Sequence, residues 1–169
     1  MPNDLSKYEA VKCQMQTGDL LLWETETLIG KTIQLFTKSH FSHASLVLRM
    51  SEYEGENQRR FTTEAVRDGV GINLLSRRLE YEKGFVWWYP LKDVSQERRN
   101  EIGRIALDYL GRPYDFKGVI RWVFKEVSVD GEALFCSELC YMAYGYTGDA
   151  PAPDDLLKLP IFGDGVQIL

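Results

Sequence analysis

Cysteine and histidine are the residue types in this chain that could together perform nucleophilic catalysis. The sequence contains three cysteines and two histidines. Of the cysteines, Cys136 lies where a short apolar stretch after the turn at Asp130-Gly131 gives way to a predicted helix. A thiol in the first turn of a helix faces unpaired backbone N–H groups and the positive end of the helix dipole, and both favour the thiolate. Cys136 is therefore the candidate nucleophile, and the same N–H groups could stabilise an oxyanion.

A cysteine nucleophile needs a base and a group that orients the base. His43 begins a predicted strand over 43–48, from which its ring can project at the sheet edge, whereas His40 lies in the preceding loop and is less constrained. Glu64 lies on the next predicted strand, 61–66, one hairpin further along the chain. Its carboxylate could hold the tautomer of the imidazole and stabilise the imidazolium. The spacing thus suits a triad of Cys136, His43 and Glu64.

Each of these residues also has a simpler structural interpretation. A cysteine near the start of a helix is commonly a small buried apolar residue. A histidine at the start of a strand is commonly a satisfied surface or core residue, and Glu64 could be one more solvated charge. Cys13 and Cys140 are assigned to packing, with Cys140 one helical turn after Cys136.

A metal site is the competing chemical interpretation of the same residue types. His40, His43, Cys136 and Cys140 supply four potential zinc ligands. Structural zinc sites usually place each ligand pair on a tight turn, whereas the two cysteines here lie one helical turn apart. The spacing disfavours zinc, and we expect neither a metal nor another cofactor.

The elements that must position these residues follow from the hydrophobic pattern. Alternation along 43–48 places His43 and Ser45 on one face of a strand, and the short connections between strands favour antiparallel pairing. The second half of the chain has helical spacing, with Ser95 as a cap and Gly111 as a stop for the first helix. Strands followed by helices indicate an α+β domain. The predicted strands are 20–23, 43–48, 61–66 and 84–91, and the predicted helices are 25–37, 95–110, 116–127 and 135–145.

Length and composition limit the classes of function. The 169 residues correspond to about one domain, so we expect a single domain over 1–169. With 44% hydrophobic and 27% charged residues the chain can build a core, and an odd number of cysteines argues against a disulfide framework. The net charge of −5 disfavours nucleic acid as a partner. The sequence lacks a signal peptide and a membrane-spanning run, which predicts a cytoplasmic protein without stable membrane insertion.

Five short motifs, taken in order, resemble one known family. This is the circularly permuted papain-fold branch of the NlpC superfamily, the YiiX-like cysteine hydrolases, whose relatives include the lecithin retinol acyltransferase group. In that branch the histidine precedes the cysteine in the chain, as His43 precedes Cys136 here. The motifs are IGKTIQ at 29–34, SHASLV at 42–47, TEA with GV at 63–65 and 69–70, GRPYD at 111–115, and FCSEL at 135–139.

The resemblance extends over about 17–145 and implies both a fold and site residues. The implied fold is papain-like in permuted order, with an antiparallel sheet packed against helices. The implied roles are nucleophile for Cys136, base for His43 and third, polar member for Glu64. Tyr114, in the GRPYD motif, is carried over as a substrate-binding or oxyanion residue. The loop 51–60 and the tail from Asp149 onward match no part of the family pattern.

The function expected from these residues is that of a thiol hydrolase. It would cleave an amide bond in a small peptide or acylated substrate through an acyl-enzyme thioester. One alternative is acyl transfer to an amine or alcohol, for which the run Trp87-Trp88-Tyr89 could line an acyl site. Another is a catalytically silent binding module, which the competent residue types at all three triad positions argue against. No motif separates cell-wall peptides, acyl lipids and protein conjugates as substrates, or indicates an oligomeric state.

Overall fold

The computed structural model describes residues 2–26, 39–53, 55, 57–66, 68–113, 136–149 and 151–169. The helix expected over 116–127, nearly all of the one expected over 25–37, and Tyr114 lie outside the described residues. Thr25 itself belongs to a strand.

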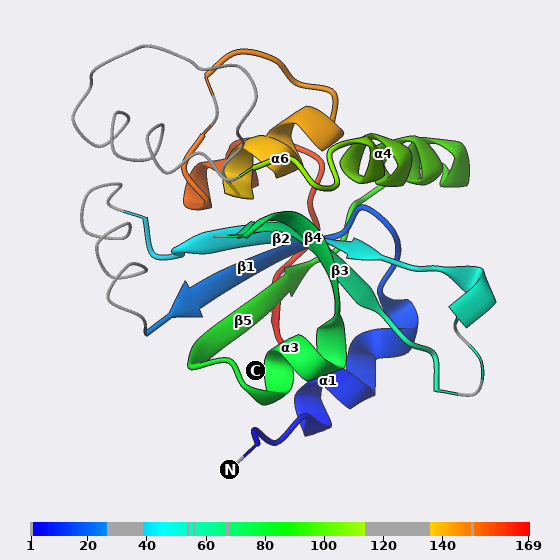
Figure 1. The fold of residues 1–169 in the computed structure, drawn as a ribbon, viewed down its shortest axis with the longest axis vertical. Helices are drawn as coiled ribbons and strands as arrows, with labels where there is room; N and C mark the ends of the chain where they lie inside the picture. The colour runs from blue at the N-terminus through cyan, green and yellow to red at the C-terminus, as the bar shows by residue number, and fades with distance from the viewer. Residues whose placement is uncertain are drawn as a thin grey trace.

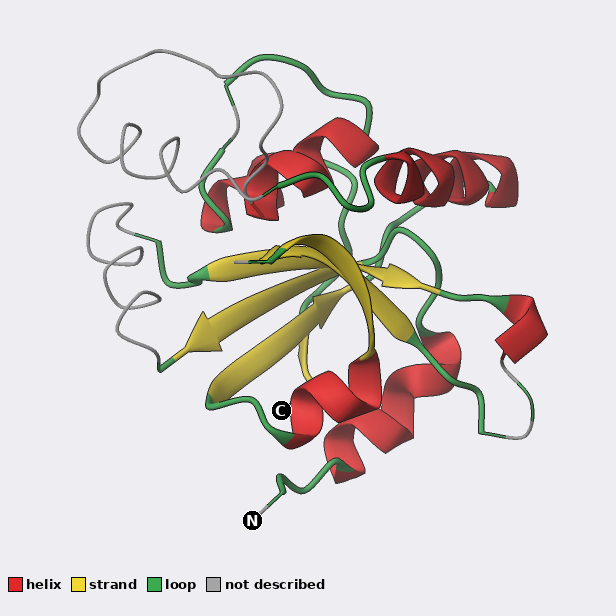
Figure 2. Ribbon diagram, in the orientation of Figure 1, coloured by secondary structure: helices red, strands yellow, loops and turns green. Residues whose placement is uncertain are grey.

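The centre of the fold is a six-stranded antiparallel sheet in the order β4-β3-β2-β1-β5-β6 (Figure 2). Two strands have the predicted limits, because alternating and β-branched residues favour a half-buried strand. β1 is two residues longer than predicted, and β5 ends two residues earlier. The strands are β1 Leu20–Thr25, β2 His43–Leu48, β3 Phe61–Val66, β4 Gly69–Leu74, β5 Gly84–Tyr89 and β6 Val166–Gln167.

Helices cover both faces of this sheet (Figure 1). On one face α4 (Gln96–Asp108) and α6 (Cys136–Ala143) pack over a cluster that includes Leu22 and Leu46. On the other face α1 (Ser6–Val11) and α3 (Leu75–Glu80) enclose a second cluster around Trp23. The period-two alternation of the strands sends successive side chains into these two cores. The other helical turns of the described residues are short 3-10 segments at Lys12–Gln14, Ser51–Tyr53 and Asp154–Lys158.

The helices α4 and α6 begin close to where the sequence predicts. Ser95 caps α4 by accepting a hydrogen bond from the Arg98 backbone N–H, as its residue type indicates. The helix ends at Asp108, two residues before the predicted limit, and Leu110 is exposed. α6 begins at Cys136, and Gly145 follows it with a φ of +83°, a conformation that favours glycine.

Several elements were not expected from the sequence. None of them has a strong periodic pattern in the sequence, because each is short and β4 also contains Gly71. They are α1, α3, β4 and β6. The two unexpected helices lie in the N-terminal half, where only strands and the helix over 25–37 were expected. The assignment of Cys13 to packing is wrong: it lies in a 3-10 turn with its side chain exposed, and the neighbouring Met15 fills the core instead.

Candidate active site

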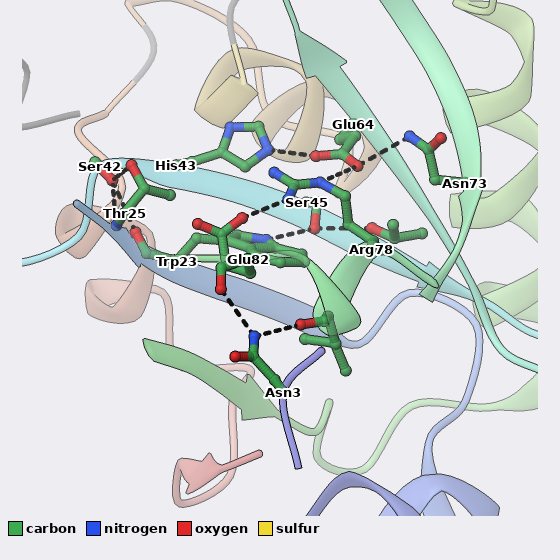
Figure 3. Close-up of polar contacts among 12 residues, drawn as sticks. Asn3, Trp23, Thr25, Ser42, His43, Ser45, Glu64, Asn73, Arg78 and Glu82 are labelled. Carbon is green, nitrogen blue, oxygen red and sulfur yellow. Dashed lines mark hydrogen bonds and ion pairs between the residues drawn. The ribbon is translucent and has the colours of Figure 1, made fainter. Parts of the chain in front are cut away.

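His43 and Glu64 meet on the face of the sheet that carries Trp23. The His43 ring projects from the first residue of β2, and its Nε2 lies 2.8 Å from Oε2 of Glu64 on β3 (Figure 3). The Glu64 side chain is fully buried and that of His43 is 13% exposed. Glu64 is therefore not a solvated surface charge, and one ring nitrogen of His43 is committed to it.

An opening in the sheet lies beside this pair. β2 and β3 are paired from Leu48–Phe61 to Leu46–Thr63, and among the described residues this pairing extends no further towards His43. β1 stays paired with β2 as far as His43, opposite Trp23. The two strands that carry His43 and Glu64 thus separate at the end where these side chains lie.

Cys136 lies at this opening, at the first residue of α6. The Val47 N–H donates to Asp19 O towards β1, so alternation along β2 turns the Ala44 N–H towards β3. There the Ala44 N–H donates to the Cys136 sulfur, as does the Ser137 N–H of the first helical turn. The thiol also hydrogen bonds to His43. With Nε2 directed at Glu64, Nδ1 is the ring nitrogen left for Cys136.

The electrostatics of Cys136 and His43 favour a thiolate–imidazolium pair. Burial raises the pKa of Cys136, but the charge and hydrogen bond of His43 and the two backbone N–H groups outweigh it and lower that pKa. Burial lowers the pKa of His43, but the Cys136 charge and hydrogen bond, followed by those of Glu64, raise it to about 10. Cys136 is only 5% exposed, so the pair is largely shielded from water.

Two further side chains hold the other oxygen of Glu64. The Asn73 amide donates to Oε1 over 3.0 Å, and Nε of Arg78 lies 3.3 Å from the same oxygen (Figure 3). Burial raises the pKa of Glu64, but its contacts with His43, the Arg78 charge and the Asn73 hydrogen bond lower it overall. The carboxylate is therefore ionised and fixed in orientation, with Oε2 directed at His43.

Arg78 is itself held in place by Trp23 and Glu82. Its guanidinium carbon lies 4.7 Å from the centre of the Trp23 ring, whose own centre is 6.0 Å from that of His43. Its Nη1 pairs with Glu82. Asn3 donates to the backbone oxygens of Leu79 and Glu82, which connects the N-terminal segment to the end of α3. These contacts form a support behind Glu64.

Sequence reasoning missed this support. Asn73 and Arg78 lie on β4 and α3, two of the elements that lacked a periodic signal. Asn73 is opposite Thr62 in the β3–β4 register, and Thr62 shares a face with Glu64. Had β4 been predicted in this register, Asn73 would have been identified as a neighbour of Glu64. The backbone contribution of Ala44 carries no sequence signal at all.

Two of the motifs that carried the resemblance pair with each other beside the sheet. Val70 N–H donates to Arg112 O, and Gly111 N–H donates to Val70 O, both over 2.9 Å. A Cβ atom at Gly69 would lie 2.6 Å from Arg112 O, and the φ of Gly69 is +106°. Glycine is therefore required at Gly69 for this close approach.

The other candidate residues have different surroundings. Cys140 is fully buried in the core under α6, which confirms its assignment to packing, and burial raises its pKa well above that of an ordinary thiol. His40 is exposed, with Nε2 3.2 Å from Glu24. In the described part of the chain, no group of three or more His, Cys, Asp and Glu side chains could hold a metal ion, so the proposed zinc ligands do not gather there.

The aromatic run divides between the two faces of β5. Trp88 is buried among the residues around Trp23, and its indole N–H donates to Asp19. Trp87 and Tyr89 are half-buried against the other core. All three pack within the fold, and Trp88 in particular faces away from α6.

The fold and the chain order define the class of this protein. A six-stranded antiparallel sheet flanked by helices, with the histidine strand before the cysteine helix, is a papain-like α+β fold in permuted order. Residues 14–158 match the family described as permuted papain-like amidase enzyme, YaeF/YiiX, C92 family. The chain therefore belongs to this family of permuted papain-like amidases.

Relatives of known sequence and of known structure are similar to the chain. The uncharacterized protein YiiX of Escherichia coli strain K12 is 29% identical over 133 residues, which cover 78% of this chain and 58% of YiiX. A crystal structure of the metalloprotein YiiX from Escherichia coli O157:H7 superposes with a TM-score of 0.62 at 27% identity, covering 78% of this chain and 65% of that one. The chain thus spans less than two thirds of the length of either relative.

None of the helices in the described residues combines the length and the apolar character that a membrane span needs.

Proposed function

We propose that this protein is a thiol hydrolase that cleaves an amide bond, with Cys136 as nucleophile, His43 as acid and base, and Glu64 as the residue that orients and charges His43. The single observation that carries the proposal is the hydrogen-bonded series from Cys136 through His43 to the buried Glu64. Cysteine hydrolases need a preformed thiolate and a proton donor at the same place. Membership of a permuted amidase family supports the amide as the bond cleaved.

In the first half of the reaction the Cys136 thiolate attacks the carbonyl carbon of the substrate. The carbonyl oxygen becomes an oxyanion, and backbone N–H groups in the first turn of α6, beside Cys136, are the donors that would stabilise it. The tetrahedral intermediate expels the amine while the His43 imidazolium gives up its proton to the leaving nitrogen. A thioester on Cys136 and a neutral imidazole remain.

In the second half water replaces the amine. The neutral His43 takes a proton from water as its oxygen attacks the thioester carbon, and the C–S bond then breaks. The products are a carboxylic acid and the Cys136 thiolate beside a protonated His43, so the starting ion pair is restored. Glu64 stays ionised throughout and stabilises the imidazolium whenever it forms, without accepting the proton.

The proposal is tested by trapping the thioester. A panel of short peptides and N-acyl amino acid amides is incubated with the intact protein, and acyl adducts are sought by mass spectrometry. We expect an acyl group on Cys136 and release of free amine. His43→Ala should slow acylation strongly, and Cys136→Ala should abolish both adduct and amine.

Cys140→Ala is the matched control, because Cys140 lies one helical turn from Cys136 and is buried in the core. We expect this variant to retain the adduct. If Cys136→Ala releases amine at the rate of the unmodified protein, or the adduct lies on another residue, Cys136 is not the nucleophile. An adduct that passes to an added amine in preference to water would identify the enzyme as an acyl transferase.

A further inference from the structure

A short segment, residues 39–42, leads into β2 and determines the position of His43, the first residue of that strand. On one side it is attached to β1, because the Ser42 N–H donates to Trp23 O over 2.8 Å and the Thr25 N–H donates to the Ser42 hydroxyl over 3.0 Å. Ser42 and Phe41 are buried. Because this segment directly precedes His43 and is attached to β1, it helps to fix the position of His43.

On its other side the segment is attached to the C-terminal tail by one carboxylate, that of Asp154. Oδ2 of Asp154 accepts from the His40 N–H over 2.7 Å, and Oδ1 accepts from the Phe41 N–H over 2.9 Å. The hydroxyl of Ser39, also buried, donates to Oδ1 over 2.6 Å. A carboxylate that receives two successive backbone N–H groups and a hydroxyl is a strong, charge-assisted clamp.

Asp154 is anchored in turn beneath the helix of the nucleophile. It begins the 3-10 turn Asp154–Lys158, whose Leu156 is fully buried in the same core cluster as Cys140 and Ala143 of α6. The partners of the carboxylate are 113 to 115 residues away in sequence. Asp154 thus connects the core cluster beneath α6 to the segment that leads into His43.

We propose that Asp154 is a positioning residue for the Cys136–His43 pair, which it acts on by fixing the backbone of 39–42. The inference rests on the proposed function and assigns a role to the tail from Asp149 onward. The His43 ring has to meet both Cys136 and Glu64 at hydrogen-bonding distance. A misplacement of about 1 Å in such an arrangement can reduce a rate about 100-fold.

The adjacent Asp155 offers a matched control. It lies on the same 3-10 turn and carries the same charge, but it pairs with Lys158 and its side chain is 43% exposed. Asp154→Ala and Asp155→Ala remove the same atoms from neighbouring positions. Only the first of them removes hydrogen bonds to the segment 39–42.

The experiment measures the alkylation of Cys136 by iodoacetamide as a function of pH, followed by mass spectrometry of the peptide that contains it. In Asp154→Ala we expect alkylation near pH 6 to be at least about tenfold slower, because a displaced His43 no longer lowers the pKa of Cys136 and the thiolate fraction at that pH falls. The profile should shift to higher pH. Asp154→Asn, which keeps the shape but loses the charge and one acceptor oxygen, should lie between. Asp155→Ala should match the unmodified protein.

A merely structural role for Asp154 would give a different result. If Asp154→Ala and Asp154→Asn lower the free energy of unfolding in urea but leave the alkylation profile of Cys136 unchanged, the inference is overturned. Should Asp154→Ala not fold, Asp154→Asn decides by the same criterion. Failure of the proposed function would show in the unmodified protein, as alkylation of Cys136 only at alkaline pH. Failure of the inference alone would show only in the Asp154 variants, so the two failures are distinguishable.

Discussion

Two buried carboxylates, Asp19 immediately before β1 and Glu64 on β3, both accept hydrogen bonds from buried donors but differ in what they control. Asp19 is 1% exposed and accepts hydrogen bonds from the indole of Trp88, the Leu91 N–H and the guanidinium of Arg99. Glu64 is also fully buried and accepts from an amide and a guanidinium.

The two carboxylates differ in one hydrogen-bond partner, which is a backbone N–H for Asp19 and the ring of His43 for Glu64. The Gln16 N–H completes the Asp19 cluster, and every donor there is permanently protonated near neutral pH. Glu64 instead uses its second oxygen for a histidine that also contacts a thiol. A carboxylate surrounded by permanent donors connects elements of the fold, whereas one that faces a titratable ring controls that ring. We therefore expect substitutions in the Asp19 cluster to change the free energy of unfolding, and substitutions around Glu64 to change the alkylation of Cys136.

The largest effect on stability is expected at Asp19. Asp19→Ala leaves the guanidinium of Arg99, only 11% exposed, without its carboxylate. Removing one partner of a buried ion pair costs about 3–5 kcal/mol, which urea denaturation would measure. The alkylation profile of Cys136 in the folded protein should be unchanged. A changed profile would show that the two clusters are not independent.

Glu64→Gln should have the converse effect. The neutral amide no longer stabilises the imidazolium, so the pKa of His43 falls and the pKa of Cys136 rises with it. Alkylation of Cys136 near pH 6 should slow by about tenfold or more, since one pKa unit changes the thiolate fraction tenfold. Asp19→Asn makes the same change of charge in the other cluster and serves as the control. Equal alkylation profiles in the two variants would contradict the distinction drawn here.

A smaller change in stability is expected from Tyr144→Phe. The Tyr144 hydroxyl is buried and donates to Gly18 O over 3.0 Å, next to Asp19. Losing this hydrogen bond should lower the free energy of unfolding by about 1 kcal/mol. Thermal or urea denaturation measures it, and the reactivity of Cys136 should not respond. A loss of reactivity without a loss of stability would place Tyr144 with the other cluster.

The smallest effect is expected from Arg78→Met, which keeps an apolar side chain over Trp23 but removes the guanidinium. The Arg78 charge lowers the pKa of Glu64, so without it Glu64 becomes protonated at a higher pH. The acid limb of Cys136 alkylation should therefore move to higher pH. Because Arg78 is 28% exposed and Glu64 keeps its contacts with His43 and Asn73, the change near pH 5 should be about two- to fivefold, which is less than the tenfold effect of one pKa unit.

Arg77→Met is the matched control for this variant, because Arg77 lies on the same helix and pairs with Glu80 at the surface. Its acid limb should coincide with that of the unmodified protein. If the two variants give the same profile, Arg78 has no part in maintaining the charge of Glu64.

The sequence predicted most of the sheet because its strands have strong local signals. The alternation over 43–48 and 61–66 reproduces β2 and β3 to the residue, and the antiparallel pairing of His43 and Glu64 strands follows from their short connection. α6 begins at Cys136, within the predicted limits. β4 was missed because Gly69 and Gly71 weaken its alternating pattern. α3 was missed because a helix of six residues is too short to show a helical period.

The side chains gathered around His43 were predicted only in part. Residue type and chain order indicated His43, Glu64 and Cys136, and the structure brings all three into contact. The separation of β2 from β3 was not predictable, because it depends on where a backbone ladder ends. Asp154 could not be predicted either, since its partners are backbone N–H groups more than a hundred residues away.

The charge of His43 near neutral pH tests the central claim most directly. The chain has two histidines, so a His40→Gln variant leaves one imidazole whose ring nitrogens can be followed by NMR through a pH titration. We expect His43 to stay doubly protonated well above pH 6.5, towards its pKa of about 10, and Cys136→Ser to bring the midpoint of the titration down. A His43 ring that loses its proton near pH 6.5 in the presence of Cys136 would contradict the thiolate–imidazolium pair.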